Sequence, residues 1–459
     1  MTGDAASTAA DGSAAPHGPI GPAYAVADAP GHAYLPRSGT PDYTVLSYDL
    51  DLSYRVATNR LDATAVITGR AVNPLTTIVL DLVHLRAKRV RVAGDKRARF
   101  TQNQTHLRIR PSAPLAAGDA FSVEVSYDGS PQPRRTRWGT LGWEELTDGV
   151  IVAAQPSGAP SWFPCNDHPA DKASYRIRVT TEEAYTVRAT GELIDHAVSG
   201  GRGRWVFERP EPTATYLAAV QIGRYVVEPR RAAGVDWVIA YPAPLARRVL
   251  ADFAPVGRML ERFGELFGPY PFPSYTVVVT ADPLEIPLEA QAMATFGANH
   301  ADGRGGSERL IAHELAHQWF GNSVGLGSWR DIWLNEGFAC YAEWLWSEAS
   351  GGPSANTLAR AHHARLRLPP HDLLLGDPGP DDMFDDRVYK RGACLLHALR
   401  LRLGDDRFFG MLREWTAEHR FGVVASADFE RLAARYAGEG LTDFFDAWLR
   451  ERRLPSLTA

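Results

Sequence analysis

Hydrophobic and polar residues alternate through the first half of the chain. The segment 45–56 reads VLSYDLDLSYRV, where large side chains from Leu46 to Tyr54 are separated by single Ser or Asp residues. This period of two is typical of a strand with one buried face. Similar short segments, punctuated by turn residues, continue to about residue 228. They predict an all-β domain, built as a sandwich or a saddle-like sheet.

The second half of the chain follows the helical period instead. Residues 242–268 have the pattern of an amphipathic helix, and residues 267–280 give a Pro-punctuated turn and a buried strand. Further helical patterns lie at 337–346, 358–367, 387–403, 406–419, 425–436 and 441–450. A strand region followed by many helices predicts an α+β domain.

These patterns divide the chain into three parts. Residues 1–36 are rich in Ala, Gly, Ser, Pro and Thr and have no core-forming pattern, so we expect a disordered tail. Residues 37–228 form the predicted β domain, and residues 229–459 form the predicted α+β domain. A length of 459 residues is ample for two such cores.

Composition narrows the class of function. The net charge of −5 does not indicate a nucleic acid or membrane partner. No apolar run approaches the length of a membrane-spanning helix, and the N-terminus has no secretory signal pattern. Cys165, Cys340 and Cys394 are far apart and odd in number, which favours reduced thiols in a cytoplasmic protein.

The chemistry is concentrated in residues 311–336, which read IAHELAHQWFGNSVGLGSWRDIWLNE. His313 and His317 are four residues apart, so they share one face of a helix and can bind one Zn²⁺ together. Glu314, between them, projects beside the metal and can reach its water. We expect the helix to begin after Ser307 and to stop near Gly321.

A catalytic zinc normally has three protein ligands and one open position, so a third ligand is needed. Glu336 is the natural candidate, because it precedes a second helix that a Gly-rich turn at 325–327 can fold back onto the first. The competing interpretation is a buried helix with two structural histidines. That interpretation requires an unpaired charge at Glu314 inside an apolar helix, which is costly.

The segments HELAHQWFGN and WLNEGFACYAEW resemble the zinc aminopeptidase family that includes aminopeptidase N and leukotriene hydrolase. The resemblance implies a β saddle followed by a thermolysin-like catalytic domain, one Zn²⁺ per chain and peptide substrates with a free N-terminus. Larger members of this family add a helical C-terminal domain over the cleft. Because the sequence ends at Ala459, we expect a short form with a more open site, or with a site that a partner subunit closes.

The resemblance also assigns roles outside the zinc motif. Gln155, upstream of the family-like turn FPCNDHP, and Glu289, in PLEIPLEAQAMATFG, are expected to bind the α-ammonium of the substrate. Glu285 competes with Glu289 for this role. Tyr389, in DRVYKRGA, matches the tyrosine that donates a hydrogen bond to the oxyanion. For Gln155 and Tyr389 the alternative is a purely structural side chain.

Other residues near these motifs have weaker claims. His168 stands where the family has Glu, and we expect it to be structural. Glu343, Asp331 and Asn335 are candidates for orienting a zinc histidine, or for capping and solvated roles.

The sequence therefore predicts a zinc aminopeptidase with Glu314 as general base. Three alternatives stay open: an endopeptidase, an epoxide hydrolase on the same scaffold, and a weakly active binding module. Oligomeric state and side-chain preference are not predicted.

Overall fold

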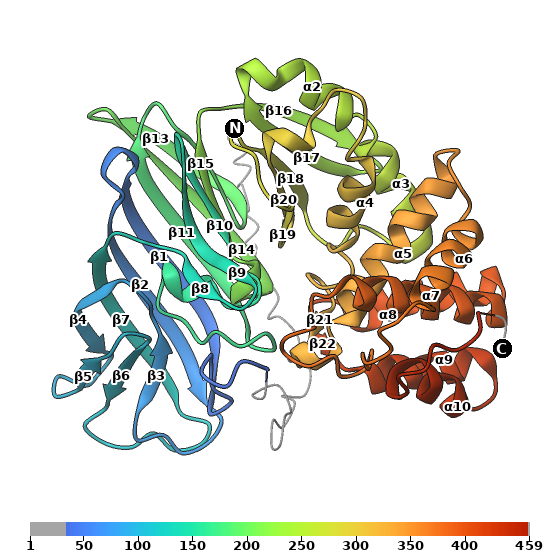
Figure 1. Cartoon of the computed structure of the whole chain (residues 1–459). Coiled ribbons are helices and arrows are strands. Elements are labelled where there is room, and N and C mark those ends of the chain that lie inside the picture. The colour runs from blue at the N-terminus through green and yellow to red at the C-terminus, as the bar shows by residue number, and fades with distance from the viewer. Residues whose placement is uncertain (1–33, 458–459) are drawn as a thin grey trace, which may run out of the picture.

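The computed structural model describes residues 34–457 and contains two units that pack side by side (Figure 1). The first unit is built on a seven-stranded sheet with the order β13-β14-β11-β1-β2-β7-β4. Its strands are β1 (Tyr43–Arg55), β2 (Arg60–Ala71), β4 (Arg86–Val92), β7 (Ala120–Gly129), β11 (Lys172–Glu182), β13 (Glu192–Ser199) and β14 (Arg202–Ala214). The pair β1–β11 is parallel, and the other pairs are antiparallel.

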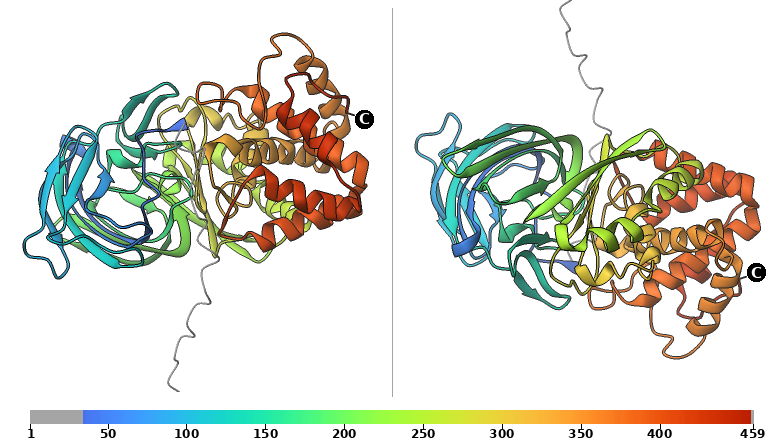
Figure 2. Two further views of the ribbon diagram at one scale, coloured as in Figure 1. Left: turned by 90° about the horizontal axis from the view of Figure 1, so that it is seen from below. Right: turned by 90° about the horizontal axis from the view of Figure 1, so that it is seen from above.

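Two smaller sheets complete this unit and enclose its core (Figure 2). A five-stranded sheet contains β12 (Thr186–Ala189), β15 (Val220–Gly223), β10 (Gly149–Ala153), β9 (Gly139–Leu146) and β8 (Arg134–Thr136) in that order. A three-stranded sheet contains β3 (Ile78–Asp81), β6 (His106–Arg110) and β5 (Arg99–Gln102). Tyr48, Leu50 and Leu52 of β1 are fully buried between the layers.

The expected alternation fails at one residue of β1. Leu46 is 39% exposed, whereas Val45 is 1% exposed. The register between β1 and β2 shifts between Val45 and Ser47, so a bulge turns Val45 inward and Leu46 outward. A bulge leaves no mark in the hydrophobic pattern, which therefore predicted Leu46 on the buried face.

The second unit combines a five-stranded sheet with a layer of helices (Figure 1). The sheet has the order β16 (Tyr225–Ala232), β17 (Val235–Pro242), β18 (Ser274–Val279), β20 (Met293–Phe296) and β19 (Leu288–Ala290). Its helices are α2 (Ala246–Asp252), α3 (Val256–Phe267), α4 (Glu308–Ala316), α5 (Trp333–Ala349), α6 (Ala355–Leu366), α7 (Asp386–Leu403), α8 (Asp405–Glu418), α9 (Ser426–Ala437) and α10 (Thr442–Phe445). A two-stranded pair joins β21 (Gly325–Leu326) to β22 (Val423–Val424).

The order of the two units confirms the predicted fold class, an all-β unit followed by an α+β unit. The segment 242–268, expected as one helix, is divided into α2 and α3. Pro255 has no backbone N–H to continue α2, but it is accommodated just before the first turn of α3. Within residues 34–457, no helix is both long and apolar enough to cross a membrane.

The structure also bears on the predicted divisions of the chain. Strand β16, which a boundary at 228 would cut, pairs along its whole length with β17. We therefore propose a boundary near residue 224. Most of the predicted tail lies outside the described residues, but Tyr34 is buried and its hydroxyl donates to Asp377 Oδ1 at 2.7 Å.

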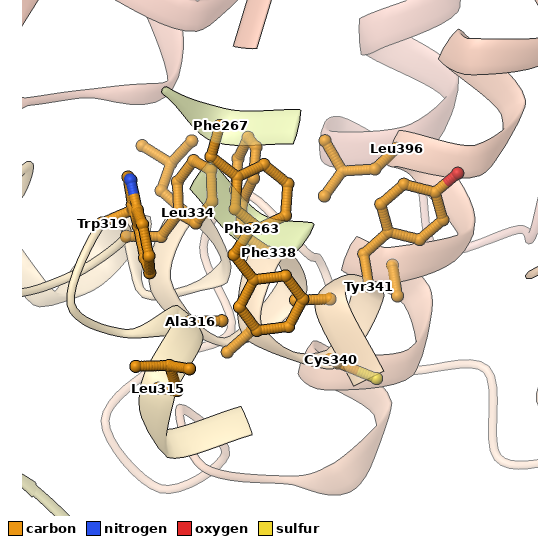
Figure 3. Packing of buried hydrophobic residues seen from close by; sticks show 14 of the residues in the cluster. Phe263, Phe267, Leu315, Ala316, Trp319, Leu334, Phe338, Cys340, Tyr341 and Leu396 are labelled. Atoms are coloured by element: carbon orange, nitrogen blue, oxygen red, sulfur yellow. The ribbon is translucent and has the colours of Figure 1, made fainter. Parts of the chain in front are cut away.

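An aromatic cluster fixes α4 and α5 against α3 (Figure 3). The ring of Phe320 stacks on Phe338 of α5 at 4.3 Å and meets Phe267 of α3 edge-on at 5.0 Å. Trp319 is also buried here and donates its indole N–H to the carbonyl of Gly268. Trp319 and Phe320 come soon after His317, so their packing holds the end of the motif helix in place.

Lys172 joins the two units at the same place. Its Nζ donates to the carbonyls of Asn322 and Ser323, at 3.1 and 2.9 Å, and to that of Gly422 at 3.3 Å. Burial lowers the pKa of this ammonium to about 7. The first strand residue after the FPCNDHP turn thus contacts the loop that follows the HExxH motif.

The turn FPCNDHP contains a buried carboxyl group whose ionisation opposes folding. Asp167 is 2% exposed, accepts a hydrogen bond from Thr215 Oγ1 at 2.7 Å, and has no partner for Oδ2 among residues 34–457. Burial, together with the nearby charge of Asp81, raises the pKa of Asp167 to about 7. The unfolded chain binds this proton less tightly, so stability falls as pH rises from the ordinary carboxyl pKa toward 7.

We expect Asp167→Asn to remove this pH dependence. Between pH 5 and 8 the native protein should lose about 2–3 kcal/mol more unfolding free energy than the variant does. Urea unfolding of both proteins at each pH, with fluorescence as the signal, measures the difference. Parallel stability profiles for the two proteins would show that Asp167 is not protonated on folding.

Candidate active site

Helix α4 supplies the first three residues of the site. His313 and Glu314 lie in its last turns, and His317 immediately follows it. Ser307 precedes the helix as expected, although its side chain makes no capping hydrogen bond. The chain then turns sharply, with Gly321 at φ +117° and the N–H of Asn322 bonded to the carbonyl of His317.

Glu336 reaches the two histidines from the first turn of α5. Its Oε2 lies 3.5 Å from His313 Nε2 and 3.4 Å from His317 Nε2. The side chains of all three residues are buried, and one ligand atom from each lies within 4.8 Å of the others. Two imidazole nitrogens and one carboxylate oxygen are the donor set of a catalytic zinc site, so the residues fit this ion.

The far ring nitrogens of both histidines are held by acceptors. His313 Nδ1 lies 2.7 Å from Glu343 Oε1, and His317 Nδ1 lies 3.1 Å from the carbonyl oxygen of Phe320. Because both partners are acceptors, each Nδ1 carries the hydrogen and each Nε2 is directed toward Glu336. Arg309 donates to the other oxygen of Glu343 at 2.9 Å.

Of the three residues considered for orienting a zinc histidine, Glu343 is the one that contacts a histidine ring in this way. Asp331 instead accepts hydrogen bonds from the backbone N–H and the hydroxyl of Ser426, at the start of α9. Asn335 is buried next to Glu336, and its Oδ1 has no partner among the described residues.

The candidate zinc ligands strongly shift one another's pKa values. Burial lowers the pKa of His313, but Glu336 and Glu343 raise it by more, to about 10. Burial raises the pKa of Glu336, but His317 and His313 lower it to about 2. The carboxylate is therefore ionised and attracts positive charge to both rings. A metal cation takes the place of those protons when it binds.

Glu314 is placed to accept a proton. It is 4% exposed, and its Oε2 has no hydrogen-bond partner within residues 34–457. Burial and the Glu289 carboxylate raise the pKa of Glu314 to about 7, although His313 opposes the shift. A carboxylate with a pKa near neutrality suits general base catalysis at physiological pH.

Glu289 comes from strand β19, which is held by the loop after α4. The amide of Asn322 donates to the carbonyl of Ala290 at 2.9 Å, and the backbone N–H of Ala292 donates to Gln318 Oε1 at 2.8 Å. One oxygen of Glu289 lies within 4.8 Å of ligand atoms of Glu314 and His317. The competing candidate, Glu285, is exposed.

Tyr389 lies in the first turn of α7, and its ring stacks on His313 at 5.9 Å. Burial and the charge of Glu336 raise the pKa of its hydroxyl, which therefore keeps its proton and can donate. Helices α5 and α7 approach closely here at two glycines. A Cβ atom on Gly337 would lie only 2.9 Å from the Cα of Gly392. This contact sets the spacing between the helices that carry Glu336 and Tyr389.

Gln155 is a predicted site residue whose side chain forms no hydrogen bond to the other predicted site residues among residues 34–457. It follows β10 and is partly buried, and its Nε2 has no hydrogen-bond partner within the described part of the chain. Tyr216 of the β unit was missed from the sequence. It is buried next to Glu289 and Glu336, and its hydroxyl lies 3.4 Å from the carbonyl of Gly321. A single aromatic residue in a β segment gives no signal for such a contact.

Comparisons with known proteins match both units of the chain. The Peptidase M1 N-terminal domain model matches residues 44–217, and the Peptidase family M1 domain model matches residues 253–448. Human endoplasmic reticulum aminopeptidase 1 is 26% identical over 436 residues, which cover 84% of this chain and 45% of that protein. Aminopeptidase N of Lactococcus lactis is 26% identical over 322 residues, covering 65% of this chain and 38% of that protein. The chain thus spans about half the length, or less, of these curated relatives.

Solved structures match over nearly their full length. An M1 zinc metallopeptidase from Deinococcus radiodurans has 29% sequence identity and a TM-score of 0.85, covering 93% of this chain and 98% of that one. A mutant of the D. radiodurans protein bound to a Tyr-Ser-Ala substrate has 30% identity and a TM-score of 0.84, covering 92% and 97%.

Proposed function

Because the chain belongs to peptidase family M1, we propose that it is a zinc aminopeptidase that removes the N-terminal residue from peptides. The observation that supports this most directly is the position of Glu289. Its side chain is partly buried, and one of its carboxylate oxygens lies within 4.8 Å of ligand atoms of Glu314 and His317. No cationic side chain of the protein is bonded to it among the described residues. A substrate ammonium group provides the missing positive charge.

In this proposal His313, His317 and Glu336 hold the zinc ion. Bound there, zinc supplies a Lewis acid for the substrate carbonyl and lowers the pKa of a water molecule to about 7. Glu343 and the Phe320 carbonyl hold the two imidazole rings in the tautomer that leaves Nε2 free to bind.

Side chains of the protein carry out the other steps of the proposed reaction. Glu314 accepts a proton from the attacking water and later delivers it to the leaving amine. The Tyr389 hydroxyl donates a hydrogen bond to the carbonyl oxygen as that oxygen gains negative charge. Glu289 accepts hydrogen bonds from the α-ammonium and so places the first peptide bond, rather than an internal one, at Glu314. Gln155 is proposed as a second acceptor for the ammonium.

The test of the aminopeptidase assignment compares one peptide with its N-acetylated form. We expect the acetylated peptide to react at least about 10–100-fold more slowly in kcat/KM, since it lacks the charged partner of Glu289. Glu289→Gln should remove most of this preference, chiefly through KM for the free peptide. The matched control is Glu285→Gln, which is exposed and lies in the loop just before β19. Equal rates for both peptides would identify an endopeptidase instead.

Tyr389→Phe tests the donor to the oxyanion. We expect kcat to fall by about 10²–10³-fold with little change in KM, because the hydrogen bond forms only as charge develops. Steady-state kinetics on an aminoacyl amide measure both constants. A fall confined to KM would show that the hydroxyl contacts the ground-state substrate and not the transition state.

The compartment is part of the same proposal. Cys165, Cys340 and Cys394 are all buried and free. Unpaired buried thiols favour a reducing compartment such as the cytoplasm.

A further inference from the structure

The residues around the proposed zinc site form two overlapping groups of metal-type ligands. Within residues 34–457, the first group is His313, His317 and Glu336, and the second is Glu289, Glu314 and His317. In both groups the ligand atoms lie within 4.8 Å of one another. The second group contains the proposed general base and the proposed ammonium ligand.

The second group also has unused binding capacity. The side chain of Glu314 is only 4% exposed, and its Oε2 has no hydrogen-bond partner in the described part of the chain. A buried carboxylate oxygen without a partner is costly, unless a cation or a donor completes it. Glu289 faces the same space and is partly buried.

His317 belongs to both groups, but it has only one nitrogen available. Its Nδ1 is directed at the carbonyl of Phe320, so Nε2 alone can bind a metal. Once an ion occupies the first group, the second retains Glu289 and Glu314. Glu336 binds that first ion, and Glu343 is shared between His313 and Arg309. Among residues 34–457, no Lys or Arg side chain forms an ion pair with Glu289 or Glu314, so their oxygens stay open to a cation.

We propose that Glu289 and Glu314 bind a second, weaker divalent metal ion in the place that the substrate ammonium occupies. Two carboxylates with open positions for water suit a divalent cation of moderate affinity. The inference rests on the proposed function, since it places the ion and the ammonium on the same carboxylates. Excess metal therefore inhibits by competing with the substrate amine and by occupying the oxygen of Glu314 that receives the proton.

The test measures metal binding as well as activity. Holoprotein carrying one Zn²⁺ is dialysed against increasing Zn²⁺, and bound metal is counted by elemental analysis. We expect a second, weaker equivalent in the native protein and in Glu285→Gln. In Glu289→Gln the affinity for the second Zn²⁺ should fall by at least about 10–100-fold. Losing a residue that only hydrogen-bonds to a metal ligand already has an effect of that size. Retention of the first equivalent in that variant shows that the site is still folded.

Competition identifies the position of the second ion. An amino-acid amide at ten times its own dissociation constant should weaken second-ion binding by about tenfold. A single equivalent in the native protein, a second equivalent that survives Glu289→Gln, or binding unaffected by the amide would each overturn the inference. If the native protein still prefers free peptides over acetylated ones in those cases, the aminopeptidase proposal stands.

Discussion

Glu314→Gln is expected to lower kcat by about 10²–10⁴-fold, the usual contribution of a positioned general base. The amide keeps the size of the side chain but cannot accept a proton from water. Glu314 is not a member of the proposed zinc trio, so the variant should retain its metal. KM should change little, because the proton moves in the transition state and not on binding.

The measurement combines steady-state kinetics with metal analysis of the same preparation. Glu308→Gln is a matched control on the same helix, since Glu308 accepts a hydrogen bond from Trp346 Nε1 outside the proposed site. The control should keep full activity and full metal content. A Glu314→Gln protein with native kcat would exclude the proposed proton transfer, whereas low activity with lost metal would point to a disturbed site instead.

His317→Ala should remove both the zinc and the activity. The Lewis acid contribution is worth several kcal/mol, so kcat/KM should fall by at least about 10³-fold. The thermal midpoint of the native protein should rise when zinc is added to the metal-free form, because a ligand that binds only the folded state stabilises it. The variant should show no such rise at the same zinc concentration.

His397→Ala is the control for this substitution. His397 is also buried in the second unit, but its ring lies between the Tyr341 hydroxyl, 3.1 Å away, and Asn356 Oδ1. Its loss should lower stability while zinc content is kept. A His317→Ala protein that retains one tightly bound zinc would show that the ion is held elsewhere.

The sequence predicts those parts of the site that local geometry controls. Two histidines at a spacing of four on a helix must share a face, and α4 places them so. Glu336 could be selected because the Gly-rich turn allows the second helix to fold back, and Glu336 lies within 3.5 Å of both Nε2 atoms. The fold class was predictable for a similar reason, since periodicity reports which face of each element is buried.

Contacts between distant segments were harder to predict. The bond between His313 and Glu343 links residues on two helices, and sequence spacing left Glu343 as one of three equal candidates. Lys172 and Tyr216 contact the loop after α4 from the other unit, through backbone carbonyls that carry no sequence signature. Gln155 followed from resemblance alone, and its Nε2 has no hydrogen-bond partner within residues 34–457.

The paired glycines Gly337 and Gly392 have a consequence for engineering the proposed site. Neither has a functional group, yet a methyl group on either would meet the backbone of the opposite helix at 2.8 to 2.9 Å. A saturation mutagenesis screen should therefore score both positions as intolerant. Milder changes that push α5 from α7 by fractions of an ångström offer a way to alter the gap between Glu336 and Tyr389 while every reactive group is left in place.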